Sequence, residues 1–152
     1  MIDSNDSKAI ARLMANARAT WAELGALLGL SAPAAADRVR RLEERGVIRG
    51  YAALVDPDAI GCGLAAMVAI TLERPEHRGP FLAKVAATPE ILECHHTAGD
   101  EDYLLKIRCT GTRSLEKLIS DELKALPGIV RTRTTVILST VKETPVLPIG
   151  QG

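Results

Sequence analysis

Apolar residues in the first 50 positions recur every three or four residues, which is the period of an amphipathic helix. This pattern predicts three helices. We expect the first to begin between Asp3 and Asp6, where acidic side chains complement the positive end of the helix dipole. Its buried stripe is predicted to consist of Ile10, Leu13, Met14 and Ala17.

The second and third predicted helices are separated by a very short turn. Thr20 and Glu23 have the spacing of a capping box, and Gly29 supplies a left-handed stop. Ser31 is a good N-cap for the next helix, and proline is tolerated in a first turn. Two helices joined in this way predict a helix-turn-helix. Their expected inner faces are Trp21, Leu24, Leu27 and Leu28, then Ala35, Val39 and Leu42.

Downstream, the hydrophobic period changes from helical to alternating. Residues 47–55 predict a pair of short strands, or wing, and residues 56–63 hold the proline and glycines of a hinge. From residue 64 the order is strand, helix, strand, strand, helix, strand, with helices near 80–87 and 115–126 and a last strand at 129–141. That order predicts a ferredoxin-like sandwich. We expect its uncovered sheet face, which includes apolar residues, to pair with a second subunit.

The chain is therefore predicted to be an α+β protein with four segments. Residues 1–50 form a winged helix-turn-helix, and residues 51–63 form a β-linker or hinge. Residues 64–143 form the sandwich, and residues 144–152, with two prolines and two glycines, form a flexible tail.

Charge supports a nucleic-acid partner for the first segment only. The 152 residues have no net charge, but residues 1–50 hold eight Lys/Arg and six Asp/Glu, a net of +2. Four of those arginines lie on the third helix, whose small residues permit close approach to a DNA backbone. We expect phosphate contacts, with sequence preference arising partly from DNA bending. The predicted DNA-binding residues are Ser31, Pro33, Ala34, Arg38, Arg40, Arg41 and Arg45.

Other site chemistries have little support in the sequence. Cys62, Cys94 and Cys109 have no metal-ligand or disulfide spacing, which is typical of reduced thiols in the cytoplasm. His95 and His96 are adjacent on a predicted strand, so they point to opposite faces and do not predict a metal site. No nucleophile or phosphate-loop motif occurs, so we do not expect an enzyme. No apolar run approaches the ~18 residues of a membrane span.

Several motifs in order resemble one family. The N-terminal ones are Ile2-Asp-x-x-Asp6-x-x-x-Ile10, Glu23-Leu-x-x-x-Leu28-Gly-Leu-Ser31, Arg38-Val-Arg-Arg-Leu-Glu43 and Gly46-Val-Ile-x-Gly50-Tyr. The later ones are Glu93-Cys-His95-x-x-x-Gly99-Asp-x-Asp102-Tyr-Leu-Leu-Lys106 and Leu126-Pro-Gly-Ile129, followed by Thr132-Arg-Thr134. Together they cover residues 2–143 and resemble the Lrp/AsnC, or feast/famine, regulators.

This resemblance implies a transcription regulator of double-stranded DNA that forms homodimers, assembles into octamers and needs no cofactor. It also implies a small amino acid as effector, bound near the Gly-Asp-x-Asp-Tyr turn and the last strand. A zwitterion needs a carboxylate for its ammonium group and backbone N–H or hydroxyl donors for its own carboxylate. The implied effector-binding residues are His96, Gly99, Asp100, Asp102, Tyr103, Thr132, Thr134 and Thr135.

Two residues depart from the family pattern and leave the effector open. Glu101 stands between the paired acids, and His96 replaces a residue that is commonly aliphatic. Both make the expected pocket more polar, so polar or charged amino acids become candidates beside leucine. Two alternative functions also remain: an architectural, nucleoid-associated DNA-binding protein, and an amino-acid-binding assembly protein with little DNA specificity.

Overall fold

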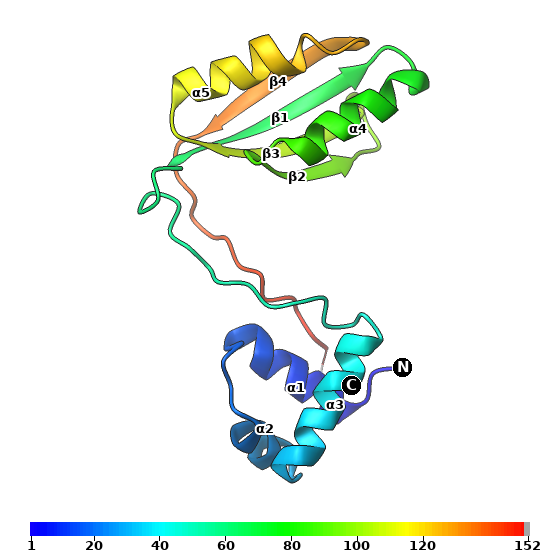
Figure 1. The fold of residues 1–152 in the computed structure, drawn as a ribbon, viewed down its shortest axis with the longest axis vertical. Coiled ribbons are helices and arrows are strands. Elements are labelled where there is room, and N and C mark those ends of the chain that lie inside the picture. Colours follow the sequence, from blue (N-terminus) through cyan, green and yellow to red (C-terminus); the bar gives the residue numbers. More distant parts are fainter. Residues whose placement is uncertain (151–152) are drawn as a thin grey trace. The chain divides into compact units, whose positions relative to one another are not determined.

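The computed structural model describes residues 1–150 and divides them into two compact units (Figure 1). The first unit contains Met1–Ala53 together with the C-terminal segment from Val141. The second unit is Leu54–Thr140. The first unit is therefore built from two segments, one from each end of the sequence.

Three helices form the first unit: α1 (Ser4–Ala15), α2 (Trp21–Leu28) and α3 (Ala32–Glu44). Helices α2 and α3 begin at the predicted caps, and α1 begins within the predicted range, where Asp3 is its cap. Asp3 accepts a hydrogen bond from the backbone of Asp6 at 2.7 Å, Thr20 accepts one from Glu23 at 3.1 Å, and Ser31 accepts one from Ala34 at 3.3 Å. Gly29 ends α2 with a φ of 67°, a left-handed conformation in which glycine avoids Cβ strain. The helix-turn-helix prediction is confirmed.

The core of this unit is smaller than the sequence predicts. It consists of Ala9, Leu13, Leu24, Leu28, Ala35 and Val39, and Leu42 is buried beside them. Trp21 and Leu27 remain 46% and 47% exposed, and Ala17 lies beyond the end of α1, so these inner-face assignments were wrong. Small residues explain the difference, because Ala9, Gly25 and Ala35 let the helices approach closely along a narrow line.

The predicted wing does not form in the part of the chain that the structure describes. Residues 45–63 contain turns and extended backbone but no strand. Ile48 packs against the helical core instead, and its N–H donates to the carbonyl of Leu42 at 3.2 Å. The Tyr51 hydroxyl donates to Glu43 of α3 at 2.7 Å. These contacts hold the start of the segment on α3, so it follows the helix rather than turning back as a hairpin.

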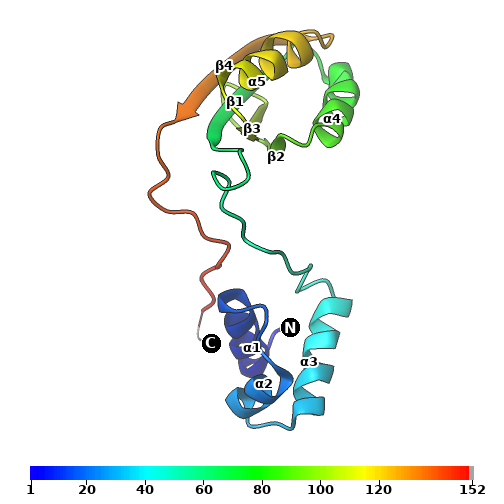
Figure 2. The ribbon, with the colours of Figure 1, turned by 60° about the vertical axis from the view of Figure 1, so that its left-hand side comes forward.

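The second unit has the predicted order. It contains β1 (Leu64–Leu72), a 3₁₀ turn (Pro75–His77), α4 (Arg78–Ala87), β2 (Ile91–His96), β3 (Tyr103–Cys109), α5 (Thr112–Glu116) with a π-helical continuation (Lys117–Leu123), and β4 (Ile129–Ile137). The sheet is antiparallel with strand order β2-β3-β1-β4. Both helices cover one face (Figures 1 and 2). The ferredoxin-like sandwich is confirmed.

The covered face holds the apolar core, which is built on alternate residues of the two central strands. Its most buried members are Val68, Ile70, Phe81, Leu105, Ile107 and Leu123. The β2 strand differs from the prediction because its register shifts between Ile91 and Glu93. Ile91 and Cys94 therefore pack against the core, while Leu92 remains 56% exposed.

The uncovered face is less apolar than the sequence predicts. Register places Met67 and Leu104 near its centre, flanked by Glu93 on one side and by Arg131 and Arg133 on the other. Lys106 and Arg108 of β3 lie on the same face beside Met67 and Ala65, so its apolar area is limited to β1 and Leu104.

The C-terminal segment also differs from the prediction. The last strand ends at Ile137 rather than at residue 141, and the following chain crosses to the first unit. There the Leu147 N–H lies 3.4 Å from the Met14 sulfur of α1. Val146, Leu147, Ile149 and Gly150 line a cavity beside α1, but within residues 144–150 only Ile149 is partly buried, so the flexibility of this segment stays a prediction. Residues 151 and 152 of that prediction lie outside the described chain. Among residues 1–150, none of the helices has the length and apolar character required to cross a bilayer.

Candidate functional site

The outer surface of α3 carries a group of exposed arginines. Ala35, Val39 and Leu42 face the core, which leaves Arg40 and Arg41 on the opposite side of the helix. Arg41 is the more exposed of the two, with 66% of its side chain accessible. Ala34 and Pro33 are also exposed at the beginning of the helix. The helix therefore presents two exposed arginines on one side and small side chains at its N-terminal end.

Asp37 holds these two arginines in the free protein. Its carboxylate accepts hydrogen bonds from both Arg40 and Arg41, and Arg40 also donates to Glu44 at 2.5 Å. The hydrogen bonds from Arg40 and Arg41 lower the pKa of Asp37 below its ordinary value of 3.8. All four side chains are solvent-accessible, so a phosphate group can compete for the guanidinium groups at small energetic cost.

Arg38 has a different place from the one predicted. Its Nη1 atom lies 2.6 Å from Asp6 and 2.7 Å from Asp3, so the side chain ties α3 to α1. The hydrogen bonds that Arg38 donates to Asp3 and Asp6 raise the pKa of Arg38. This arginine is bonded within its own unit, although it lines the same surface cavity as Arg41 and Arg45.

Arg45 and Tyr51 mark the end of α3. The Arg45 guanidinium donates to the backbone carbonyl of Met1 at 3.0 Å, and the side chain remains at the surface. Partial burial, together with the hydrogen bond to Glu43, raises the pKa of Tyr51 to about 12, so this hydroxyl stays protonated as a donor. Sequence reasoning did not identify this bond, because Tyr51 was taken as a member of the wing.

Gly25 is a second residue that sequence reasoning missed. An added Cβ would lie 2.7 Å from the carbonyl oxygen of Leu30. The turn between α2 and α3, which sets the direction of α3, passes directly over Gly25, and only glycine leaves room for it. The lack of a side chain within the apolar stripe of α2 was the available signal.

In the second unit, several of the implied ligand residues lie in one row across the sheet. His96 pairs with Tyr103, Tyr103 with Ile70, and Ile70 with Thr132. Directly opposite residues in antiparallel strands point to the same face. The His96 ring stacks on Tyr103 with centroids 5.0 Å apart, and Phe81 of α4 packs against the same ring at 4.9 Å. Phe81 was not predicted as part of this group.

The two remaining threonines are separated by the strand alternation. Thr134 pairs with Val68, so it shares the face of Thr132 one step along β4. Thr135 pairs with Met67 and points to the opposite face. One compact group therefore contains Thr132 and Thr134 but excludes Thr135.

The turn between β2 and β3 is fastened by its second aspartate. The carboxylate of Asp102 accepts a hydrogen bond from the backbone of Leu72 at 2.7 Å, and the Asp102 N–H donates to the Ile70 carbonyl. Gly99 and Asp100 are exposed at the tip of the turn. The two aspartates thus have different surroundings: one anchors the turn to β1, and the other projects from it.

Glu101 is neutralised by the last strand. Arg133 approaches its carboxylate at 2.7 Å and Arg131 at 3.6 Å, and both arginines belong to the uncovered face. Only 17% of the Glu101 side chain is accessible. This acid therefore adds no free negative charge beside Tyr103, contrary to the expectation of a more polar pocket at that point.

Comparisons with known proteins agree with both units. The AsnC-type helix-turn-helix domain matches residues 2–43, and the Lrp/AsnC ligand binding domain matches residues 65–147. The leucine-responsive regulatory protein of Haemophilus influenzae is 40% identical over 94% of this chain and 87% of its own length. The HTH-type transcriptional regulator LrpA of Mycobacterium tuberculosis is 40% identical over 91% of each chain.

Two solved structures extend this likeness to the whole fold. A transcriptional regulator from Neisseria meningitidis in complex with L-Met has a TM-score of 0.92 and 31% identity, covering 97% of both chains. A feast or famine regulatory protein from M. tuberculosis complexed with L-methionine has a TM-score of 0.90 and 37% identity, covering 99% of this chain and 100% of that one. The relatives are regulators of transcription rather than enzymes. With its helix-turn-helix followed by a ligand-binding sandwich, the chain belongs to the Lrp/AsnC family of transcriptional regulators.

Proposed function

We propose that the outward face of α3 contacts DNA through Arg40, Arg41 and Arg45, with Pro33 and Ala34 allowing close approach. The observation that carries this proposal is the exposed position of Arg40 and Arg41 opposite the buried face of α3. Ser31 contributes by capping α3, since its hydroxyl oxygen accepts a hydrogen bond from the Ala34 N–H. Arg38 is assigned to the α1–α3 contact and not to the duplex.

Phosphate contacts supply affinity, and the lack of long hydrogen-bonding side chains at the start of α3 points to DNA shape as a source of preference. A fluorescence-anisotropy titration with the DNA upstream of the protein's own gene tests this at several salt concentrations. We expect an affinity that falls steeply with salt and exceeds the affinity for unrelated DNA at least 1000-fold, on the order of specific regulators. Equal affinity for all duplexes would favour the architectural alternative.

We further propose that a small amino acid binds beside the Gly99 turn. Asp100 is the acceptor for its ammonium group, because the Asp102 carboxylate already accepts a hydrogen bond from the Leu72 N–H of β1. Thr132 and Thr134 supply hydroxyl donors, and the stacked rings of His96 and Tyr103 supply a wall. L-methionine is the first probe, since two related structures contain it.

A thermal-shift screen of the twenty amino acids tests the ligand proposal. A ligand at ~100 times its dissociation constant stabilises the protein by about 2.7 kcal/mol, which gives a clear rise in the unfolding midpoint. If none of the twenty raises the midpoint at millimolar concentration, the amino-acid proposal fails while the DNA proposal stands.

Assembly and location follow from the same features. The linker and the segment after β4 carry apolar side chains that are exposed to water in a single chain. Met67 and Leu104 on the uncovered sheet face add to this apolar surface. We therefore propose a homodimer that assembles further into an octamer, which light scattering of the purified protein tests.

A regulator of transcription acts on the chromosome, so we place it in the cytoplasm.

A further inference from the structure

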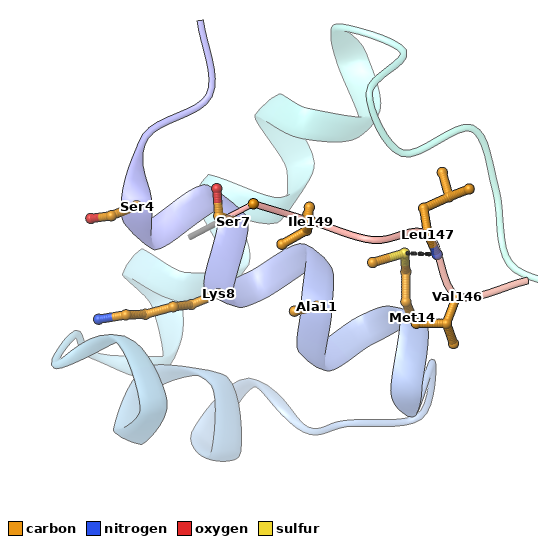
Figure 3. Close-up of a pocket in the computed structure, with 9 residues that line it drawn as sticks. Ser4, Ser7, Lys8, Ala11, Met14, Val146, Leu147 and Ile149 are labelled. Carbon is orange, nitrogen blue, oxygen red and sulfur yellow. Dashed lines mark hydrogen bonds between the residues drawn. The ribbon is translucent and has the colours of Figure 1, made fainter. Parts of the chain in front are cut away.

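The outer face of α1 carries a binding site that the proposed function does not use. A cavity of about 540 Å³ runs along this helix, lined by Ser4, Ser7, Lys8, Ala11 and Met14 on one side and by residues 146–150 on the other. Both sides belong to the first unit, although they are more than 130 positions apart in the sequence. The C-terminal segment lies across α1 at this place (Figure 3).

The residues under the segment lie opposite the buried side of α1 or at its flank. At about 100° per residue, Ala11 is nearly opposite the side of the helix that carries Asp6, Ala9 and Leu13, whereas Ser7 and Met14 lie at its flank. Helix α1 therefore has its own helical unit on one side and the C-terminal segment on another, and Ala11 stays exposed in the cavity between helix and segment. The outward face of α3 is left open by this arrangement.

The contact has both polar and apolar parts. The Leu147 N–H donates to the Met14 sulfur at 3.4 Å, and Val146 lies beside the same methionine (Figure 3). Ile149 is partly buried against α1, nearer Ser7 and Ala11 (Figure 3). The small side chain of Ala11 lets the extended backbone come close to the helix.

The linker and the C-terminal segment both join the sheet at the same end of β1 and β4. The linker enters β1 at Leu64, and the C-terminal segment leaves β4 after Ile137. Ala65 and Ile137 are paired in the sheet, so both connections begin at the same end of neighbouring strands. One connection reaches α3, and the other reaches α1.

We propose that residues 146–149 are a strap that docks on the outer face of α1 and completes the DNA-binding unit. The docking site takes an extended apolar segment, and its occupant is the C-terminus of this chain. The strap gives the three helices a second connection to the sheet, which is non-covalent at α1 and follows the chain from the strand that carries Thr132 and Thr134.

Trp21 offers a direct readout, because it is the only tryptophan of the chain and lies on α2. Thermal unfolding of the full-length protein, followed by its fluorescence, reports on the first unit. We expect Val146→Asp and Ile149→Asp each to lower the unfolding midpoint by about 4 °C or more. Val141→Asp is the matched control, since this side chain is 98% exposed on the same segment, and it leaves the midpoint unchanged.

A second pair of variants tests the helix side of the contact. On an uncovered helix surface Ala→Glu is nearly neutral, because both residues favour helix. Ala11→Glu lowers the Trp21 midpoint if the strap docks over it, whereas Ala15→Glu, at the end of α1, does not. Combining Ala11→Glu with Ile149→Asp has less effect than the two separate shifts added, because both remove the same contact.

Midpoints of the strap variants equal to those of their controls, or additive shifts in the double variant, would overturn the strap. The measurement involves neither DNA nor an amino acid. Its outcome is therefore independent of the proposed DNA and ligand contacts, and either proposal can fail alone.

Discussion

The Nη1 atom of Arg38 lies 2.6 Å from Oδ1 of Asp6, which joins the third helix to the first. The Asp6 side chain is only 8% accessible, so its partner is an arginine drawn inward rather than one held out for a ligand. This pair separates the arginines of α3 into two classes. One supports the unit, and the others are displayed on its surface.

Arg38→Ala is expected to destabilise the first unit. It leaves a nearly buried carboxylate without its guanidinium, which costs about 2 kcal/mol, toward the low end for such pairs because Arg38 is itself partly accessible. Urea unfolding followed by Trp21 fluorescence measures the change. Arg18→Ala, an exposed position outside the pair, serves as the control, and equal midpoints for the two variants would contradict the structural assignment.

Asp37→Asn is expected to tighten DNA binding. The substitution removes the anion that holds Arg40 and Arg41, and it adds one positive charge to the outward face of α3. Exposed pairs of this kind contribute little to stability, so the fold is retained. Anisotropy titrations should show higher affinity for all duplexes tested.

Arg41→Ala provides the opposite change at the same place. Affinity should fall, and the dependence of log K on log salt should become shallower by about 0.9 if one phosphate contact is lost.

Glu122→Gln neutralises a paired acid in the other unit and is the matched control for Asp37→Asn. Identical titration curves for Asp37→Asn and wild type would remove α3 from the interface.

Helix caps and the two hydrophobic periods were sufficient to predict most elements. Thr20, Gly29 and Ser31 act over three or four residues, so their effect is visible in the sequence. The alternation in β1 and β3 likewise determines which side chains face the helices. Such local rules explain why the helix-turn-helix and the sandwich were both predicted.

The failures come from contacts between distant segments. Nothing near Arg38 in the sequence indicates that Asp3 and Asp6 lie beside it, and nothing near residue 147 indicates Met14. Ile48 and Tyr51 were read as a strand because their neighbours are apolar, but the helical core and Glu43 provide stronger partners. In β2, the register shift moved Leu92 out of the core, which a strict period of two does not foresee.

Thr132→Val is expected to reduce amino-acid binding without loss of the fold. The substitution keeps the shape of the side chain and removes its hydroxyl on the face that carries Tyr103 and His96. The rise in unfolding midpoint caused by the ligand identified in the screen should fall by at least half. Thr135→Val is the control, because Thr135 is on the opposite face of the same strand. A larger loss in the control than in Thr132→Val would place the ligand on the uncovered face.

Gly25→Ala and Gly29→Asn should differ sharply in effect. The Cβ added at position 25 meets the Leu30 carbonyl, and the turn must open to accommodate it. We expect a loss of about 2 kcal/mol in unfolding free energy and weaker DNA binding, because the aim of α3 changes. Gly29 has a φ of 67° and open space around it, and asparagine tolerates that conformation, so Gly29→Asn should cost less than about 1 kcal/mol. Urea unfolding of both variants tests the order, and a reversed order would contradict the tight turn.

Asp3 makes the stability of the first unit depend on acidity. The hydrogen bond from the Asp6 backbone and the one from Arg38 lower the pKa of Asp3 below its ordinary value of 3.8. A carboxylate with a lowered folded-state pKa stabilises the fold at pH values above its unfolded pKa, and this contribution is lost as the pH falls through the folded value. The wild-type unit should therefore weaken below about pH 4. Asp3→Asn keeps an N-cap acceptor but removes the titration, so its Trp21-monitored urea midpoint should change less between pH 6 and pH 3. Asp121→Asn, in the other unit, should follow the wild type, and a wild-type slope in Asp3→Asn would show that this carboxylate does not contribute.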